Sequence, residues 1–160
     1  MILGLGLDVV DVVLFAEQLA DGASGFVAAT FRPSERRRGD PNDPNGPNGP
    51  NDPNDPTDPR RRALHLAGRF AAKEAFVKAW SSARRGQPPA LAPADLDLRD
   101  IEVVDDGFGR PALRLHGPVR NAVERLDEGR PPVVHLSISH DGATAAAVVV
   151  LEENATALES

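Results

Sequence analysis

The sequence predicts an α+β protein in which a mainly antiparallel sheet packs against one long helix and several shorter helices. Residues 2–10 alternate apolar with small or acidic residues, as a strand with two different faces does. Residues 59–83 form one long stretch of helix-forming sequence without an internal proline or turn signal. Residues 101–117 and 132–152 each contain two strand-like segments around a turn with glycine. Because helices and strands do not alternate as βαβ units, an antiparallel arrangement is expected.

The first strand has an unusual distribution of side-chain sizes. One face carries apolar residues, namely Leu3, Leu5, Leu7 and Val9, and the other carries Gly4, Gly6 and Asp8. Glycines in a strand leave room for a close approach of another backbone. Asp8 is therefore expected at the glycine-lined end of this strand, pointing into the space that the glycines leave. A short helix from about Val12 to Ala20 follows, and residues 24–38 predict one more.

The long helix has clear boundary signals at both ends. Asp58 is a suitable N-cap and Pro59 suits the first helical position, while Gly86 follows the last expected turn near Ala83. After the hairpin of residues 101–117, an amphipathic helix is expected, with one apolar stripe. The stripe consists of Val119, Val123 and Leu126.

Length and composition indicate one domain. Residues 1–152 fit a single unit with one core, and residues 153–160 read as a tail. Residues 40–59 form a low-complexity loop rich in Pro, Asn and Asp, with a proline at every third position, which favours an extended surface spacer; a regulatory or binding motif is the alternative. Five of the acidic residues lie in this loop, so the net charge of −6 falls to about −1 in the remainder.

That charge distribution limits the partners. A near-neutral body argues against nucleic-acid binding, because a nucleic-acid binder carries a basic excess. The absence of cysteine excludes disulfides and thiolate sites, and no apolar run approaches the roughly 18 residues that cross a bilayer. The expectation is a cytoplasmic protein without membrane contact.

Both lysines of the chain lie in the long helix, and the sixteen other cationic side chains are arginines. Lys73 falls within the apolar arc of the helix, while Glu74 and Lys78 lie one turn apart. A structural explanation is an i,i+4 ion pair with Lys73 extending its ammonium group to solvent. Lysine differs from arginine in being a compact donor that can lose its proton, which favours a chemical role here.

Asp8 and His140, at the ends of two predicted strands, are further candidates for a chemical role beside the charged residues of the long helix. Taken singly, such an acid or histidine is more often structural. Asp8 and Glu74 together supply two carboxylates, and Mg²⁺ commonly takes one or two carboxylates together with water and phosphate oxygens. Two carboxylates with nearby bases for phosphate are typical of phosphoryl transfer.

With these residues in place, the sequence resembles the holo-[acyl-carrier-protein] synthases, the small 4′-phosphopantetheinyl transferases. The resemblance covers nearly all of the chain except residues 40–59 and the tail. It runs through "ILGLGLDVVDV", "GRFAAKEAFVKAW", "RDIEVVDDGFGRPALRLHG" and "VHLSISHDGATAAAVVVLE". The resemblance implies transfer of the 4′-phosphopantetheine arm of coenzyme A to a serine of apo-acyl carrier protein in fatty-acid biosynthesis. The other product would be adenosine 3′,5′-bisphosphate.

The resemblance also implies roles for residues. Asp8 and Glu74 match the Mg²⁺ ligands, and Glu74 is expected to accept the serine proton, directly or through a metal-bound water. Lys78 matches the lysine beside the bridging phosphate. Arg69 and His140 match residues around the nucleotide phosphates, and the turn Gly109, Arg110 and Pro111 matches the segment that flanks the adenine. Similar proteins are homotrimers with the active site between subunits.

One departure concerns carrier-protein docking. Many family members place an arginine shortly after the first strand, where this chain has Val13 and Leu14. Arg36–Arg38 or Arg60–Arg62 are candidates to replace it. Two other functions stay open at this point: a non-catalytic module that binds coenzyme A or a nucleotide, and a structural protein that forms trimers. The pair of carboxylates with Lys78 disfavours the first, because binding alone would not require it, and buried charges would be a liability in the second.

Overall fold

The structure, a computed structural model, describes residues 1–36, 58–126 and 130–154. Its strands are β1 (Ile2–Asp11), β2 (Ile101–Asp105), β3 (Pro111–Leu115), β4 (Val133–Asp141) and β5 (Thr144–Glu152). Its helices are α1 (Val12–Ala20), α2 (Phe26–Thr30), α3 (Pro33–Arg36), α4 (Pro59–Ala83) and α5 (Gly117–Val123), with short 3-10 turns η1 (Pro93–Asp95) and η2 (Leu98–Asp100). The predicted α+β class is confirmed, and every strand pairing is antiparallel.

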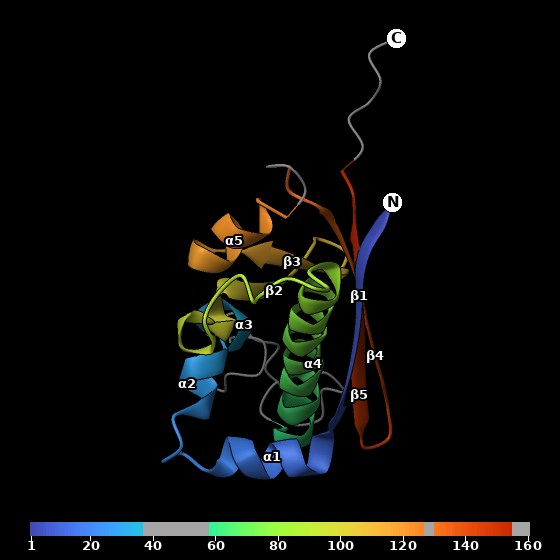
Figure 1. Ribbon diagram of the computed structural model, residues 1–160. Helices are drawn as coiled ribbons and strands as arrows, with labels where there is room; N and C mark the ends of the chain where they lie inside the picture. The colour runs from blue at the N-terminus through green and yellow to red at the C-terminus, as the bar shows by residue number, and fades with distance from the viewer. Residues whose placement is uncertain (37–57, 127–129, 155–160) are drawn as a thin grey trace.

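Helix α4 lies at the centre of the molecule, between two layers (Figure 1). On one side is a three-stranded sheet in the order β1-β5-β4. On the other side are the β2–β3 hairpin and the short helices α2, α3 and α5. A helix covered on both sides needs apolar residues around most of its circumference, which is what the sequence of α4 supplies.

The glycines of β1 allow α4 to pack directly on the sheet. A Cβ atom added at Gly6 would overlap the carbonyl oxygen of Ala75, and one at Gly4 would overlap that of Ala79. The predicted close approach of a backbone to this strand is therefore confirmed, and the backbone is that of α4. We call the face of the sheet that packs on α4 the inner face; it contains Gly4, Gly6, Asp8 and Val10 of β1.

The opposite, outer face of β1 is not covered by any of the residues that the structure describes. Leu5 and Leu7 are each 58% exposed and Val9 is 59% exposed. One detail of the sequence analysis is wrong: β1 continues to Asp11, so Asp8 lies within the strand and not at its end. Asp8 is paired with Ala147 of β5, which is in turn paired with Ile138 of β4.

Most predicted boundaries agree with the structure. Asp58 caps α4 by accepting a hydrogen bond from Arg60 N at 2.9 Å, and the helix runs from Pro59 to Ala83 as expected. The single helix expected over residues 24–38 is instead two short helices, because Phe31 is extended and Pro33 disfavours a helical residue before it. Helix α5 ends at Val123, earlier than expected, and Leu126 still packs on the core.

Three sequence predictions lie partly or wholly outside the described residues: the form of the 40–59 loop, the basic cluster beyond Arg36 and the tail after residue 154. In the ranges that are described, no helix is both long and apolar enough to cross a bilayer.

Candidate active site

An ion pair joins α4 to β1. Nζ of Lys78 lies 2.8 Å from Oδ1 of Asp8 and also donates a hydrogen bond to the carbonyl oxygen of Leu7 at 3.1 Å. Asp8 reaches α4 because its position in β1 puts it on the inner face, directly after the glycines that bring the helix close. The Asp8 side chain is mostly buried, whereas that of Lys78 is 53% exposed. The ammonium group is thus anchored at the protein surface.

Glu74 lies one helical turn before Lys78 and is half-buried. Burial raises the pKa of Glu74, the negative charge of Asp8 raises this pKa further, and the charge of Lys78 partly offsets both effects. The negative charge of Asp8 therefore acts against ionisation of Glu74. Two neighbouring carboxylates with incomplete charge compensation form a site that favours a cation.

The chemistry of these two acids fits Mg²⁺. Among the residues that the structure describes, no group of three or more His, Cys, Asp or Glu side chains is placed to hold a metal ion. A Mg²⁺ site needs only one or two protein carboxylates when water and phosphate oxygens complete the octahedron. Lys78 contacts Oδ1 of Asp8, so Oδ2 and the Glu74 carboxylate are the oxygens that would hold the ion.

The other lysine has a different environment. Lys73 is fully buried and its Nζ lies 2.9 Å from Oε2 of Glu35, which is 1% exposed. It also donates hydrogen bonds to the carbonyl oxygens of Leu98 and Ile101, at 2.9 Å and 2.6 Å. The expectation that Lys73 extends its ammonium group to solvent is therefore wrong. Sequence analysis placed Lys73 in the apolar arc correctly but did not identify Glu35 as its partner.

Arg69 is held inside the protein on the opposite side of α4 from Lys78. The two residues are nine positions apart, about two and a half helical turns, so they point in opposite directions. Nη2 of Arg69 lies 2.7 Å from Oδ2 of Asp105, at the end of β2, and Nη1 lies 3.1 Å from Nδ1 of His65. Its side chain is 10% exposed.

The predicted nucleotide-contacting turn follows Asp105 at the tip of the β2–β3 hairpin. Gly109 adopts a φ of +79°, and Pro111 begins β3. Asp106 organises this turn: its Oδ1 accepts a hydrogen bond from Arg110 N at 2.9 Å, and its Oδ2 accepts one from Arg110 Nε at 2.6 Å. The side chain of Arg110 is thereby held at the surface beside the ring of Phe108.

His140 is exposed near the end of β4. It is paired with Ala145, whose other neighbour in the sheet is Val10 of β1, so it shares the inner face with Asp8 but lies at the far edge of the sheet. Strand β4 contacts β3, which places this edge next to the hairpin. The structure thus brings together Asp8, Glu74 and Lys78. It places Arg69 and the 109–111 turn on the other side of α4, and His140 at the β4 edge of the sheet, two strands away from Asp8.

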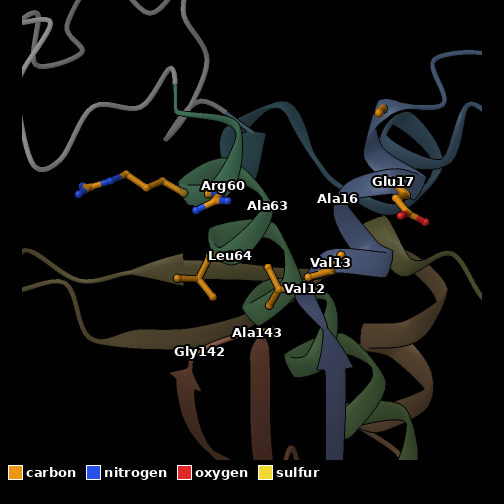
Figure 2. A pocket seen from close by; sticks show the side chains of 11 residues that line it. Val12, Val13, Ala16, Glu17, Arg60, Ala63, Leu64, Gly142 and Ala143 are labelled. Atoms are coloured by element: carbon orange, nitrogen blue, oxygen red, sulfur yellow. The ribbon is translucent and has the colours of Figure 1, made fainter.

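A groove that sequence analysis did not predict lies at the N-terminal end of α4 (Figure 2). It has a volume of about 640 Å³ and is lined mainly by apolar side chains of α1 and α4. Figure 2 shows Val12 and Val13 of α1 on one side and Leu64 of α4 on the other, with Arg60 at the rim. The only sequence signal for it was the replacement of an expected arginine by Val13 and Leu14, which are both exposed.

Comparison with known proteins identifies the family. Residues 4–148 match the family model of the 4′-phosphopantetheinyl transferase superfamily. The chain belongs to this superfamily. It is 42% identical over 151 residues to the holo-[acyl-carrier-protein] synthase of Mycobacterium ulcerans strain Agy99, covering 94% of this chain and 97% of that protein. The resemblance inferred from the sequence is confirmed.

The chain also superposes on solved structures of transferases with this fold. The ACPS–CoA complex of Chronobacterium ammoniagenes superposes with a TM-score of 0.73 at 39% identity, covering 95% of this chain and 98% of that one. The acyl carrier protein synthase of Mycobacterium tuberculosis gives a TM-score of 0.65 at 38% identity over the same shares of the two chains. The predicted phosphopantetheinyl transferase fold is therefore confirmed.

Proposed function

We infer that this chain is a holo-[acyl-carrier-protein] synthase. It transfers the 4′-phosphopantetheine moiety of coenzyme A to a serine of apo-acyl carrier protein and releases adenosine 3′,5′-bisphosphate. The observation that carries this inference is the Asp8–Lys78 pair with Glu74 beside it, in a chain 42% identical over nearly its whole length to a holo-[acyl-carrier-protein] synthase. We place the reaction in the cytoplasm, where coenzyme A and free carrier proteins meet.

The reaction replaces a phosphoanhydride bond of coenzyme A with a phosphoester bond to serine. The serine Oγ forms a bond to the phosphorus that bears the pantetheine arm, and the bond from that phosphorus to the bridging oxygen breaks. Glu74 is the carboxylate that accepts the serine proton, either directly or through a water molecule. Lys78 is the ammonium group that stabilises the negative charge left on the departing bisphosphate. A Mg²⁺ ion held by Asp8 and Glu74 would neutralise the diphosphate charge.

We further propose that the active site lies between copies of this chain in a homotrimer. Arg69, His140 and the 109–111 turn are our candidates for binding the nucleotide end of coenzyme A. Arg69 and the 109–111 turn lie on the opposite side of α4 from the Asp8–Lys78 pair, and His140 lies at the far edge of the sheet, so we propose that a neighbouring copy brings both sets to one diphosphate. The exposed outer face of β1 supplies an apolar surface for such an assembly.

The test of the function is direct. The protein is incubated with coenzyme A, Mg²⁺ and apo-acyl carrier protein, and the carrier is weighed by mass spectrometry. A gain of one phosphopantetheine per carrier is expected. If several carrier proteins show no gain while coenzyme A still binds, the protein is a non-catalytic binding module instead.

The assembly has its own test. Leu7→Glu places a charge on the outer face and should convert the trimer to monomers in analytical ultracentrifugation, whereas Gln18→Glu, in α1, should not. Glu74→Gln and His140→Ala should each be poorly active alone. Mixed trimers should regain activity if one copy supplies Glu74 and its neighbour His140. A wild-type monomer, or mixing without any regain, would exclude the shared site.

A further inference from the structure

We propose that the buried Lys73–Glu35 pair positions β2 by supplying the backbone hydrogen bonds that a neighbouring strand would otherwise supply. The pair thereby fixes the hairpin that we assign to coenzyme A. This inference rests on the proposed function. Lys73 and Glu35 are not candidates for contact with the reacting atoms, because both are fully buried where α4 packs against α3 and β2.

Strand β2 pairs with β3 along one edge only. Asp100 O accepts a hydrogen bond from His116 N, and Asp106 N donates one to Arg110 O, so the bonds to β3 use the even-numbered residues. The backbone groups of Ile101 and Val103 consequently point to the other edge of β2. At that edge no further strand is present among the described residues. Buried backbone groups without partners would be costly there.

The ion pair supplies the partners that a strand would have provided. Nζ of Lys73 donates to Ile101 O at 2.6 Å, and Oε1 of Glu35 accepts from Val103 N at 3.1 Å. One side chain thus acts as the donor and the other as the acceptor of a neighbouring strand. The 2.9 Å contact between Nζ and Oε2 of Glu35 joins the two into one unit.

The hydrogen bonds also explain why this position is a lysine. A lysine ammonium group has three protons and no acceptor. Here the three protons meet Oε2 of Glu35, Leu98 O and Ile101 O. Oε2 of Glu35 accepts one more hydrogen bond, from Arg32 N at 2.8 Å. A flat guanidinium group does not match three acceptors arranged around one nitrogen atom.

Helix α4 therefore holds β2 at both ends. Lys73 binds the start of the strand, and Arg69, one turn earlier, binds Asp105 at its end. The turn that contains Gly109, Arg110 and Pro111 follows directly from this strand. Loss of the pair would free the edge of β2 and displace the turn, while Asp8 and Lys78 on the opposite side of α4 would keep their contact.

The experiment compares Lys73→Met, Lys73→Arg and the double variant Lys73→Met/Glu35→Leu with the wild-type protein. The double variant removes both buried charges together, which avoids the cost of leaving one unpaired and keeps a folded protein for the test. Glu124→Gln, in the exposed Arg120–Glu124 pair, is the matched control for loss of an ion pair. Steady-state kinetics are measured against coenzyme A and against carrier protein, with circular dichroism to establish folding.

We expect the KM for coenzyme A to rise roughly ten- to hundredfold in the double variant, because a small displacement of a binding turn has effects on this scale. The KM for carrier protein and kcat should stay within about twofold of wild type. Lys73→Arg should not restore the KM. Hydrogen exchange of the Val103 amide should be faster in the double variant and unchanged in Glu124→Gln.

A folded double variant with an unchanged KM for coenzyme A would overturn the inference, as would an equal fall in kcat with no change in KM. Failure of the proposed function gives a different result. In that case the wild-type protein transfers nothing to any carrier. The Val103 amide then still reports whether Lys73 and Glu35 close the edge of β2.

Discussion

Nζ of Lys78 lies 2.8 Å from Oδ1 of Asp8, although the two residues are 70 positions apart in the chain. The contact exists because glycines bring α4 onto β1 immediately before Asp8. Glu74, one turn away on the same helix, is close enough for the charge of Asp8 to raise its pKa. These three side chains form the part of the site that a single chain can assemble, and the first two predictions concern them.

Asp8→Asn and Glu74→Gln should each reduce kcat by about 10²–10⁴-fold, the range associated with loss of a positioned base or its partners. Both variants should also need more Mg²⁺ to reach their own maximal rate, because each loses one candidate metal oxygen. Activity is measured as a function of Mg²⁺ concentration. Melting temperatures should change little, since an ion pair with Lys78 half-exposed contributes little to stability. An unchanged Mg²⁺ requirement in both variants would exclude them as ligands.

Lys78→Arg should be poorly active, by about 10²-fold, the scale of losing one aligned charge-stabilising donor. A guanidinium group keeps the charge but not the compact geometry that reaches Asp8 and Leu7 O together. Single-turnover transfer measures the chemical step. Arg85→Lys, at an exposed position after α4, is the control and should behave as wild type. Near-wild-type rates in Lys78→Arg would show that Lys78 serves only as a surface charge.

The packing of α4 on β1 gives a prediction about stability. Gly6→Ala would place a Cβ against the backbone of Ala75 and Ala79, which has little freedom to move. The free energy of unfolding should fall by about 1–3 kcal/mol, as in other overpacked interiors, and Asp8 should lose its position relative to Lys78. Gly22→Ala, where the added Cβ meets nothing within 4 Å, should change it little. Urea denaturation compares the two, and equal effects would contradict the argument.

The sequence contained enough information to predict α4 from Asp58 to Ala83, because the capping residue, the proline and the apolar arc are all local signals. It also singled out Asp8, Glu74 and Lys78 as one candidate site, and their chemical roles stay a prediction. It could not supply the partner of Lys73: Glu35 is 38 positions earlier in a four-residue helix, and the residues between them contain no apolar pattern that relates the two segments. Helical geometry alone predicts that Arg69 and Lys78 point in opposite directions. Only the structure shows that Arg69 faces the β2–β3 hairpin and Lys78 faces β1.

The buried carboxyl group of Glu102 leads to a prediction of how stability depends on pH. Burial opposes ionisation of Glu102, but hydrogen bonds from Ser34 and His116, with the charges of His116 and Arg114, outweigh it and lower the pKa of Glu102 below its usual 4.5. The folded protein therefore binds fewer protons than the unfolded chain just below pH 4.5. The contribution of ionised Glu102 to the free energy of unfolding is present above this pH and is lost as the pH falls. The difference in unfolding free energy between wild type and Glu102→Gln should shrink below pH 4.5. A difference that is constant from pH 7 to pH 3.5 would contradict the shift.

The groove between α1 and α4 leads to a prediction about the acceptor. Carrier proteins are acidic, and Arg60 and Arg61 are the exposed cations beside this apolar groove. We expect them to replace the arginine that relatives carry after the first strand, with Val13 providing apolar contact. The variant Arg60→Glu/Arg61→Glu should raise the KM for carrier protein several-fold at low salt. The increase should become smaller near 0.5 M salt, where exposed charges are screened within about 4–5 Å.

The KM for coenzyme A should not change in this variant, because neither arginine is among the residues that we assign to the nucleotide. Arg85→Glu makes a similar change of surface charge away from the groove and should leave both KM values near wild type. If Arg85→Glu raised the KM for carrier protein as much as the double reversal, net charge and not the groove would control docking. Val13→Ser tests the apolar contribution to docking. It should raise the KM for carrier protein without altering the salt dependence of this KM, because the substitution removes apolar contact area and no charge.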